Sequence, residues 1–593
     1  MERSRTQVLF TYLPEAVFVH ESGLVAKSFS IRGAPNTAIN REVLLGEIDQ
    51  YLRHWQDDAV LGISRPSHVD PSDFQILTPE LVRWEIWPLK FECARESCGR
   101  IVSFRRPEDI PRHARCSHCR APLRQLRYYS AHECGRIQDM YVPQCSQGHG
   151  YDHVYFEDTG TFRTAVFRCR ACNNAVIRRT LQSPCRCVGS GGEHPMMHAY
   201  TVRDTRTYYP HRISLINLQS RTFNELQSHP ARGSIAVASY LGLLGSAGSI
   251  REGLAEANRG SSAPAMPGQE WDERELQFRE MGLLDDQIAE IKRAIGPRAV
   301  GLAAVADLDD RIVGLAASRP IVERAAVFDT TEMQRIALDE ARSSLRDRGE
   351  TAESATISEA IARGFSLGIE EIAVTWSFPI AMAAFGYTRC VNSVGEGVFQ
   401  GFARTGAYDG KFPIFAVASD TEALLVTLTP SAVLRWLSEA SLWAGPSPTE
   451  AGDMRRAILK VFANREGNPE PAAAVETLVH TMSHALLRAL EDGQVGFAEA
   501  SLAEWVVPET LTFALYANNL KSYTLGALWT LLNNRTLQWL DKAAGSVLRC
   551  ENDPLCHQRS PRACERCLYL TFGCPTFNDR LDRKLLARFW CDA

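Results

Sequence analysis

The sequence predicts a mixed α/β protein of several domains, on three observations. The chain has 593 residues, and at about 100 to 200 residues per domain this length predicts roughly three to five units. Apolar residues recur with helical spacing in some regions and in short strand-like runs in others. Most cysteines gather in two regions, one in the N-terminal third and one at the C-terminal end. These features together indicate a chain built from modules of different kinds.

The composition is that of an ordinary folded protein. Hydrophobic residues make up 45% and charged residues 23% of the chain, so extensive disorder is not expected. The net charge of −5 gives no global case for nucleic-acid binding, which would therefore need a local basic patch. We find neither a signal-peptide pattern nor the roughly 20 consecutive apolar residues of a membrane segment, so the sequence predicts a cytoplasmic protein that does not enter a membrane.

Four consecutive regions follow from periodicity and composition. The first is an α/β segment, the second is rich in cysteine, the third is mostly helical, and the last is an α/β domain that ends in a second cysteine cluster. The predicted boundaries are 1–90, 91–200, 201–350 and 351–593.

Local patterns predict particular elements within these regions. Alternation over 8–12 suggests a strand, and 42–48 has the spacing of a helix. Glycine, serine, alanine and proline at 245–269 predict a flexible linker. The apolar runs at 412–418 and 423–429 predict buried strands of the C-terminal domain.

The first cysteine set has the spacing of a zinc ribbon. The chain carries 17 cysteines, and an odd number in a chain without an export signal favours metal-binding thiols over disulfides. Cys93 and Cys98 form one close pair, and Cys116 and Cys119 form a second. Four thiolates saturate a tetrahedral zinc ion and leave no position for a reactive water, so we expect a structural site. Unligated core cysteines are the alternative interpretation.

The second cysteine set is ambiguous. Cys145 with His149 and Cys169 with Cys172 repeat the layout of the first ribbon and form the preferred quartet. A quartet of Cys169, Cys172, Cys185 and Cys187 competes closely with it. At least one of the seven possible ligands is expected to be surplus, and these seven are Cys134, Cys145, His149, Cys169, Cys172, Cys185 and Cys187.

A third set lies near the C-terminus. Cys550 and Cys556 are followed by the close pair Cys564 and Cys567, with Cys574 as an additional cysteine. Redox chemistry at the Cys564 pair is the weaker interpretation, because such a pair normally starts a helix in a βαβ unit. The three sets together predict two to three structural Zn²⁺ ions.

The first cysteine-rich region is also rich in arginine. Arginine binds phosphate oxygens bidentately, and the nearby Tyr128 and Tyr129 could stack on exposed bases, so a nucleic-acid surface is one interpretation. A solvated or partner-binding face is the alternative. The arginines are Arg95, Arg100, Arg105, Arg106, Arg112, Arg115, Arg120, Arg124, Arg127 and Arg136.

No complete catalytic motif is found in the sequence. The phosphate loop, nucleophile elbow, kinase and dinucleotide-binding patterns do not occur, so no catalytic or nucleotide-binding residue is assigned. His480 and His484 lie one turn apart on a helix predicted at 472–490. A metalloprotease helix would need glutamate where Thr481 stands, so we expect packing or hydrogen bonding for these histidines.

Several segments of the C-terminal half occur in a characteristic order. These are residues 478–488 (LVHTMSHALLR), 523–528 (YTLGAL), the cysteine cluster 550–574 and 581–583 (LDR). In this order the chain resembles the helicase-associated, cysteine-rich domain of unknown function of the DrmB family, a subunit of DISARM antiphage systems. The resemblance extends to 386–389 (GYTR), to the cysteine-rich region and to 5–12 (RTQVLFTY), and so covers most of the chain.

The resemblance implies an accessory subunit that pairs with the DrmA helicase as a heterodimer or in a larger complex. It implies that DNA is engaged through that complex and that the helicase supplies the ATP-driven motor. Cys550, Cys556, Cys564 and Cys567 match the family's C-terminal metal-binding cysteines, and Cys574 could replace one of them. The family provides no catalytic residue to carry over.

Two other functions are considered. One is a metal-dependent nuclease or hydrolase that uses His480 and His484 with an acidic residue such as Glu499 or Glu504. The other is a free-standing zinc-ribbon regulator of RNA or transcription, which would leave the large α/β and helical remainder unexplained.

Overall fold

The chain forms two compact units, each assembled from two separate stretches of sequence. Unit 1 comprises Met1–Leu215 and Ala381–Ala418, and unit 2 comprises Ile216–Ile380 and Ser419–Ala593. The computed structural model describes residues 4–53, 55, 70–158, 164–178, 181–187, 194–244, 249–259, 279, 281, 301–393, 397–445, 448–491, 497–498, 501–518, 526–548, 550, 555–558, 562–564, 566–570 and 573–592.

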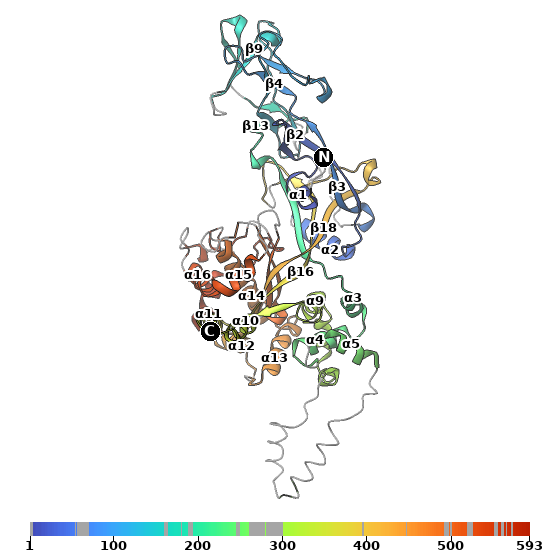
Figure 1. The fold of residues 1–593 in the computed structure, drawn as a ribbon, viewed down its shortest axis with the longest axis vertical. Coiled ribbons are helices and arrows are strands. Elements are labelled where there is room, and N and C mark those ends of the chain that lie inside the picture. Colours follow the sequence, from blue (N-terminus) through green and yellow to red (C-terminus); the bar gives the residue numbers. More distant parts are fainter. Residues whose placement is uncertain are drawn as a thin grey trace. The chain divides into compact units, whose positions relative to one another are not determined.

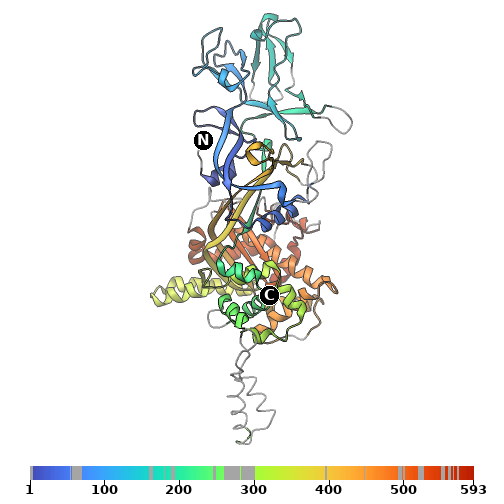
Figure 2. The same cartoon turned by 90° about the vertical axis from the view of Figure 1, so that its right-hand side faces the viewer.

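Unit 1 contains part of a large mixed sheet together with three small sheets. The large sheet runs in the order β1-β2-β3-β18-β16-β14, and the small ones are β5-β4-β6, β11-β10-β9 and β12-β13-β7-β8. The short strands of the small sheets lie together at one end of unit 1 in both views (Figures 1 and 2). The elements of unit 1 are α1 (Arg5–Thr11), β1 (Val17–Val19), β2 (Val25–Pro35), α2 (Arg41–Leu52), β3 (Phe74–Ile86), β4 (Lys90–Cys93), β5 (Ile101–Ser103), β6 (Leu123–Gln125), β7 (Tyr128–Ala131), β8 (Ile137–Asp139), β9 (Val154–Glu157), β10 (Val166–Cys169), β11 (Ala175–Arg178), β12 (Ser183–Pro184), β13 (Met196–Thr201), β14 (Tyr209–Ile216) and β17 (Gln400–Gly401).

The core of unit 1 forms between helix α2 and the large sheet. Leu44 and Ile48 on the inner face of α2 are fully buried and belong to one apolar cluster with Ile76 of β3 and Ile414 of β18. The side chain of Asn40 begins the helix by accepting a hydrogen bond from the Val43 N–H at 3.2 Å. This core joins residues 39–76 to residues 381–418, so the two stretches of unit 1 depend on each other.

Unit 2 is largely helical around strands of the same sheet. β20 pairs antiparallel with β18 and with β19, and β15 pairs with β16. The elements are α3 (Arg221–Ser228), α4 (Arg232–Tyr240), α5 (Ile250–Arg259), α8 (Asp310–Ala316), α9 (Arg319–Val327), β15 (Arg335–Ala337), α10 (Leu338–Asp347), α11 (Thr351–Ser366), β16 (Ile369–Thr388), β18 (Phe412–Leu428), α12 (Pro430–Glu439), α13 (Ala451–Ala463), α14 (Pro469–Glu491), β19 (Leu502–Val507), β20 (Thr512–Ala517), α15 (Ala527–Asn534), α16 (Thr536–Leu548) and α17 (Arg583–Asp592). The unit boundaries fall within β14, β16 and β18.

Helix α14 is the central element of the unit 2 core. It is apolar on almost every side, and Leu478, Met482 and Leu486 are fully buried among side chains of the surrounding helices and strands. Helices α13, α16 and α17 and the strands β19 and β20 pack against it. The indole N–H of Trp539 on α16 donates to the Leu486 carbonyl at 2.8 Å, which fixes α16 against α14.

The mixed α/β, multidomain fold predicted from the sequence is confirmed, and the four predicted regional boundaries stay a prediction. Strands distant in sequence pair within unit 1: 412–415 of β18 lie parallel to 74–77 of β3. One local element differs from its prediction. Residues 8–12, predicted as a strand, fall largely in helix α1. The Gln7 N–H donates to the Ser4 hydroxyl, and the Ser4 N–H donates to the Gln7 side-chain oxygen. This capping box stabilises a helix here, although the alternation of apolar residues predicts a strand.

The predicted linker at 245–269 is helical in part. Residues 250–259 form α5, whose Ile250 and Leu254 lie four residues apart and are buried in a second apolar cluster of unit 2. The other residues of that stretch, apart from Ser249, lie outside the described residues, as does most of 271–300. Among the helices that the structure describes, none has the length and apolar content needed to cross a bilayer.

Candidate metal centres

Five groups of metal-capable side chains converge in the part of the chain that the structure describes. In each group the four ligand atoms all lie within 4.8 Å of one another. We call them the ribbon tetrad (Cys93, Cys98, Cys116, Cys119), the His149 tetrad (Cys145, His149, Cys169, Cys172), the His132 tetrad (His132, Cys134, Cys185, Cys187), the C-terminal tetrad (Cys550, Cys556, Cys564, Cys567) and the mixed group (His480, His484, Glu504, Cys574).

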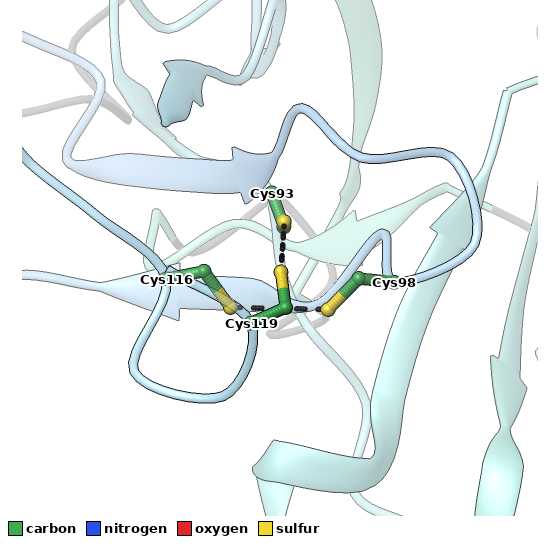
Figure 3. A group of neighbouring side chains, drawn as sticks. All are labelled: Cys93, Cys98, Cys116 and Cys119. Carbon is green, nitrogen blue, oxygen red and sulfur yellow. Dashed lines mark hydrogen bonds between the residues drawn. The ribbon is translucent and has the colours of Figure 1, made fainter. Parts of the chain in front are cut away.

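The ribbon tetrad is made by two turns that face each other. Cys93 ends β4, and Cys98 follows in a turn closed by its own N–H donating to the Arg95 carbonyl at 2.8 Å. Figure 3 shows the four sulfurs pointing to a common centre. The Cys93 and Cys119 sulfurs lie 3.3 Å apart and those of Cys98 and Cys116 lie 3.8 Å apart. Zinc–sulfur bonds of about 2.3 Å place tetrahedral sulfurs about 3.8 Å apart, so the spacing fits a zinc ion.

The negative charges of the four thiolates in the ribbon tetrad also favour the binding of a cation. Burial raises the pKa of the Cys93 thiol to about 12. The backbone N–H of Ala121 has the opposite effect on Cys119 and lowers the pKa of that thiol to about 7. Four thiolates at this spacing repel one another, and a divalent cation supplies the charge that lets all of them ionise.

The His149 tetrad gathers the four residues preferred from sequence spacing. His149 Nδ1 lies 3.2 Å from the Cys172 sulfur and 3.6 Å from the sulfurs of Cys145 and Cys169. Cys169 ends β10, and the two residues after Cys172, Asn173 and Asn174, have positive φ, which turns the chain back into β11. The competing quartet of Cys169, Cys172, Cys185 and Cys187 does not form.

The His132 tetrad was not predicted from the sequence. The Cys134 and Cys185 sulfurs lie 3.6 Å apart, and His132 Nδ1 lies 3.5 Å from the Cys187 sulfur. The two halves come from the β7–β8 turn and from the residues after β12, on the same small sheet. With His132 counted, none of the seven candidates of the second set is surplus. Two pairs, His132 with Cys134 and Cys185 with Cys187, are each separated by a single residue. This spacing was the sequence pattern from which the tetrad could have been predicted.

A buried arginine supports the turn that carries the His132 tetrad. Arg389 is 0% exposed, and its guanidinium donates to the carbonyls of Gly135, Thr207 and Glu15 at 2.7 to 2.8 Å. Gly135 follows Cys134 and has a φ of 81°, a conformation that glycine adopts readily. Arg389 therefore joins this turn to the rest of unit 1.

The C-terminal tetrad contains the four cysteines predicted from the third set. The sulfurs of Cys550 and Cys564 lie 3.5 Å apart, and those of Cys556 and Cys567 lie 3.8 Å apart. Cys564 and Cys567 form a turn in which the Cys567 and Leu568 N–H groups both donate to the Cys564 carbonyl at 3.1 Å. Cys574 is not part of this tetrad.

The structure places Cys574 with the two histidines of α14. His480 Nε2 lies 3.4 Å from the Cys574 sulfur and 3.2 Å from Glu504 Oε1. His484 Nε2 lies 3.0 Å from the same carboxylate oxygen. Packing and hydrogen bonding were the roles expected for these histidines. Those roles do not account for Glu504 and Cys574, whose side chains converge on both rings. Glu499, the other acidic residue considered, lies outside the described residues.

The mixed group is strongly coupled electrostatically. Burial alone would lower the pKa of His484, but the Glu504 carboxylate beside it raises that pKa to about 10. His480 responds in the same way, with a pKa raised to about 9. Burial alone would raise the pKa of Glu504, but the two imidazoles hold it well below its usual range. The carboxylate therefore requires positive charge beside it.

The arginines of the first ribbon lie on its surface, but the two tyrosines do not. Tyr128 is 3% and Tyr129 is 0% exposed, and their hydroxyls donate to Asp158 and Thr207, so the expectation that they stack on bases is wrong. Both tyrosines lie on β7, whose four residues are all buried. Of the ten arginines, Arg124 pairs with Glu92 and Arg127 pairs with Asp158.

Comparison with known proteins adds one match. Residues 4–210 match a family model described as a domain of unknown function (DUF8724). The match covers about a third of the chain, and the ribbon, His149 and His132 tetrads all lie inside it. A search of curated proteins found no match. The matched region ends close to Leu215, where the first stretch of unit 1 ends.

Proposed function

We propose that this chain is a non-ATPase accessory subunit of a DISARM-type antiphage defence complex. In this role it binds the DrmA helicase and helps to form or gate the DNA path of that helicase. The observation that carries the proposal is the arginine-rich surface held by the ribbon tetrad. The resemblance to the DrmB family supplies the identity of the partner and the location in the bacterial cytoplasm.

The cysteine tetrads support a structural role for Zn²⁺ in this proposal. Each offers four ligands to one ion, and four protein ligands leave no open position for a reactive water. Zinc in such sites stabilises small modules and presents their surfaces. We therefore assign one structural zinc ion to each of the four tetrads, which is more than the two to three expected from sequence.

The surface of the ribbon has the charge that phosphate recognition requires. Residues 93–125 contain eight arginines and three acidic residues. A guanidinium without a protein carboxylate can bind phosphate oxygens bidentately. Six of the arginines are exposed and make no ion pair with a described residue, and these are Arg95, Arg105, Arg106, Arg112, Arg115 and Arg120.

DNA binding by the complex of this chain with its helicase tests the role of this surface. The variant replaces Arg105, Arg106 and Arg112 by alanine, and we expect affinity for DNA to fall by about tenfold or more. The slope of log affinity against log salt should decrease by about three, one for each phosphate that is no longer neutralised. Equal loss of affinity in the control below would contradict the proposal.

The control variant makes the same change of net charge elsewhere in unit 1. It replaces Arg5, Arg83 and Arg203 by alanine, which are also exposed arginines. DNA affinity and its salt slope should remain near those of the unchanged complex. Co-purification of the chain with the helicase encoded beside it tests the partnership separately, and failure to associate would remove this part of the proposal.

A metal-dependent nuclease or hydrolase that uses His480 and His484 is the second candidate function. The convergence of Glu504 on both histidines favours it. We rank it second because Cys574 occupies the place that a hydrolytic water would need, and because Glu504 and His484 are fully buried. The double variant His480→Ala, His484→Ala tests it: loss of phage protection with intact folding and intact helicase binding would favour this candidate.

A further inference from the structure

Three segments of unit 2 bring the mixed group together. His480 and His484 come from α14, Glu504 comes from β19, and Cys574 lies on the loop before α17. The loop is held on β19 by the Glu504 N–H, which donates to the Gly573 carbonyl at 3.2 Å. Gly573 has a φ of 91°, and a Cβ there would lie 2.8 Å from Ala503, so this approach requires glycine. The position of Cys574 is therefore fixed by the backbone.

The tautomer of His484 is set by the hydrogen bond that its Nδ1 atom makes, on the side of the ring away from Glu504. Nδ1 lies 2.8 Å from the Leu568 carbonyl oxygen, which can only accept, so Nδ1 carries a hydrogen. In the neutral ring, Nε2 then holds a lone pair that points at the Glu504 carboxylate, 3.0 Å away. Two acceptors would then face each other, so positive charge must lie between them, either as a proton on Nε2 or as a metal ion. Metal-binding histidines usually have this arrangement, with the outer N–H donated to a carbonyl or carboxylate.

Glu504 and Cys574 are oriented by similar contacts. The Ser483 hydroxyl donates to Glu504 Oε2, which leaves Oε1 to face both histidines. The Asn578 N–H donates to the Cys574 sulfur at 3.4 Å, and the Thr576 hydroxyl lies at the same distance from it. Hydrogen bonds to sulfur stabilise the thiolate, which is the form that binds metal.

The spacing of the four ligand atoms fits one tetrahedral ion. Zinc–nitrogen and zinc–oxygen bonds of about 2.0 to 2.1 Å and a zinc–sulfur bond of about 2.3 Å place such ligands about 3.3 to 3.6 Å apart. Three of the separations are 3.0, 3.2 and 3.4 Å, slightly shorter than these distances, and all four atoms lie within 4.8 Å of one another. A proton shared between His484 and Glu504 would explain one of these contacts but not the convergence of His480 and Cys574 on the same point.

We propose that His480, His484, Glu504 and Cys574 bind a zinc ion of their own, in a closed site that fixes the loop before α17 to α14 and β19. Two imidazoles, a carboxylate and a thiolate suit a transition ion such as Zn²⁺, and nitrogen and sulfur ligands exclude Mg²⁺ and Ca²⁺. Four protein ligands and the burial of Glu504 and His484 leave no position for water. This site does not rest on the function proposed above.

The site is also connected to the C-terminal tetrad. Leu568, whose carbonyl fixes the His484 tautomer, directly follows Cys567, and its N–H donates to the Cys564 carbonyl. The turn that carries two ligands of one ion thus orients a ligand of the other. Loss of zinc from the C-terminal tetrad should weaken binding at the mixed group.

The decisive experiment is a crystal structure of the full chain with anomalous data at the zinc edge. We expect a peak enclosed by the four ligand atoms of the mixed group, with no solvent ligand, in addition to one peak in each tetrad. Side chains in the same positions without a peak would overturn the site. A peak that carries a water while Cys574 is turned away would overturn the claim that it is closed.

Metal analysis of variants tests the same site in solution. Zinc per chain should be close to five in the unchanged protein and close to four in Cys574→Ser, because the tetrads keep their ions. The matched control is Cys591→Ser, an exposed cysteine of α17 that should leave the count at five. If Cys574→Ser does not fold, His480→Gln replaces it, since His480 is the more exposed of the two histidines. An unchanged zinc content in a folded variant would contradict the proposal.

Discussion

The ribbon tetrad and the mixed group hold four ligand atoms at similar spacing but in very different surroundings. Among the described residues, the apolar cluster of the ribbon tetrad is small: it contains Cys93, Cys98 and Cys116, with the partly buried Cys119, Ala121 and Leu123 packed against them. The mixed group lies on α14, whose apolar face belongs to the main core of unit 2. In the first region the metal site takes the place of a core, whereas in the second a core exists without it. Metal binding should therefore supply a larger fraction of the folding free energy in the ribbon than in unit 2.

Removal of zinc should give the largest difference between the two regions. Binding of structural zinc supplies about 10–16 kcal/mol in small modules, so a chelator should unfold the ribbon while α14 remains folded. Hydrogen exchange checks this: amides at 90–125 should lose protection and amides at 475–490 should keep most of theirs. Restoring zinc should restore the ribbon. Equal loss of protection in both regions would show that unit 2 also depends on metal for its core.

Substitution of Arg389 should give the next largest effect, within unit 1. Arg389→Leu leaves three buried carbonyls without their donor and removes the ion pair with Glu15, at a cost of about 3–5 kcal/mol. Hydrogen exchange of the amides at 128–140, measured at increasing urea concentration, gives the change in the free energy of unfolding. Arg389→Lys should also destabilise, because one ammonium lacks the planar fork that reaches the three carbonyls. A stability equal to that of the unchanged chain would contradict the role given to this arginine.

A cavity in the unit 2 core should have a smaller and metal-independent effect. Leu486→Ala removes a fully buried side chain of α14 and should cost about 3 kcal/mol. Hydrogen exchange of the α14 amides, measured against urea concentration, reports the unfolding of this core. The control is Leu548→Ala at an exposed position, which should change stability by about 0.5 kcal/mol or less. An effect of Leu486→Ala that vanished on zinc removal would break the distinction between the two regions.

The smallest expected effect is at the cap of α1. Ser4→Ala removes the hydroxyl that accepts from the Gln7 N–H and should destabilise this helix by about 1 kcal/mol. Exchange of the α1 amides measures the loss, and Ser4→Asp should preserve the cap. No change on Ser4→Ala would mean that packing of Val8 and Leu9 alone maintains the helix in place of the predicted strand.

The sequence by itself determined the parts of this protein whose information is local. Close cysteine pairs lie in single turns, and their spacing predicted the ribbon tetrad outright. For the His149 and C-terminal tetrads the spacing gave the preferred ligands but left a competing quartet and Cys574 open. The helix α2 and the strand β18 follow from periodicity in the same way. In these cases the residues that define the feature are neighbours along the chain.

Only the tertiary structure decided the features whose parts are distant in sequence. His132 meets Cys185 and Cys187 because β7 and β13 pair, and Glu504 and Cys574 meet the histidines of α14 because β19 and the loop before α17 pack on it. The pairing of β3 with β18 likewise joins residues 74–77 to 412–415 and makes unit 1 discontinuous. The physical reason is that these residues meet when apolar faces of strands and helices bury one another. The spacing of residues along the sequence does not show which faces will pack together.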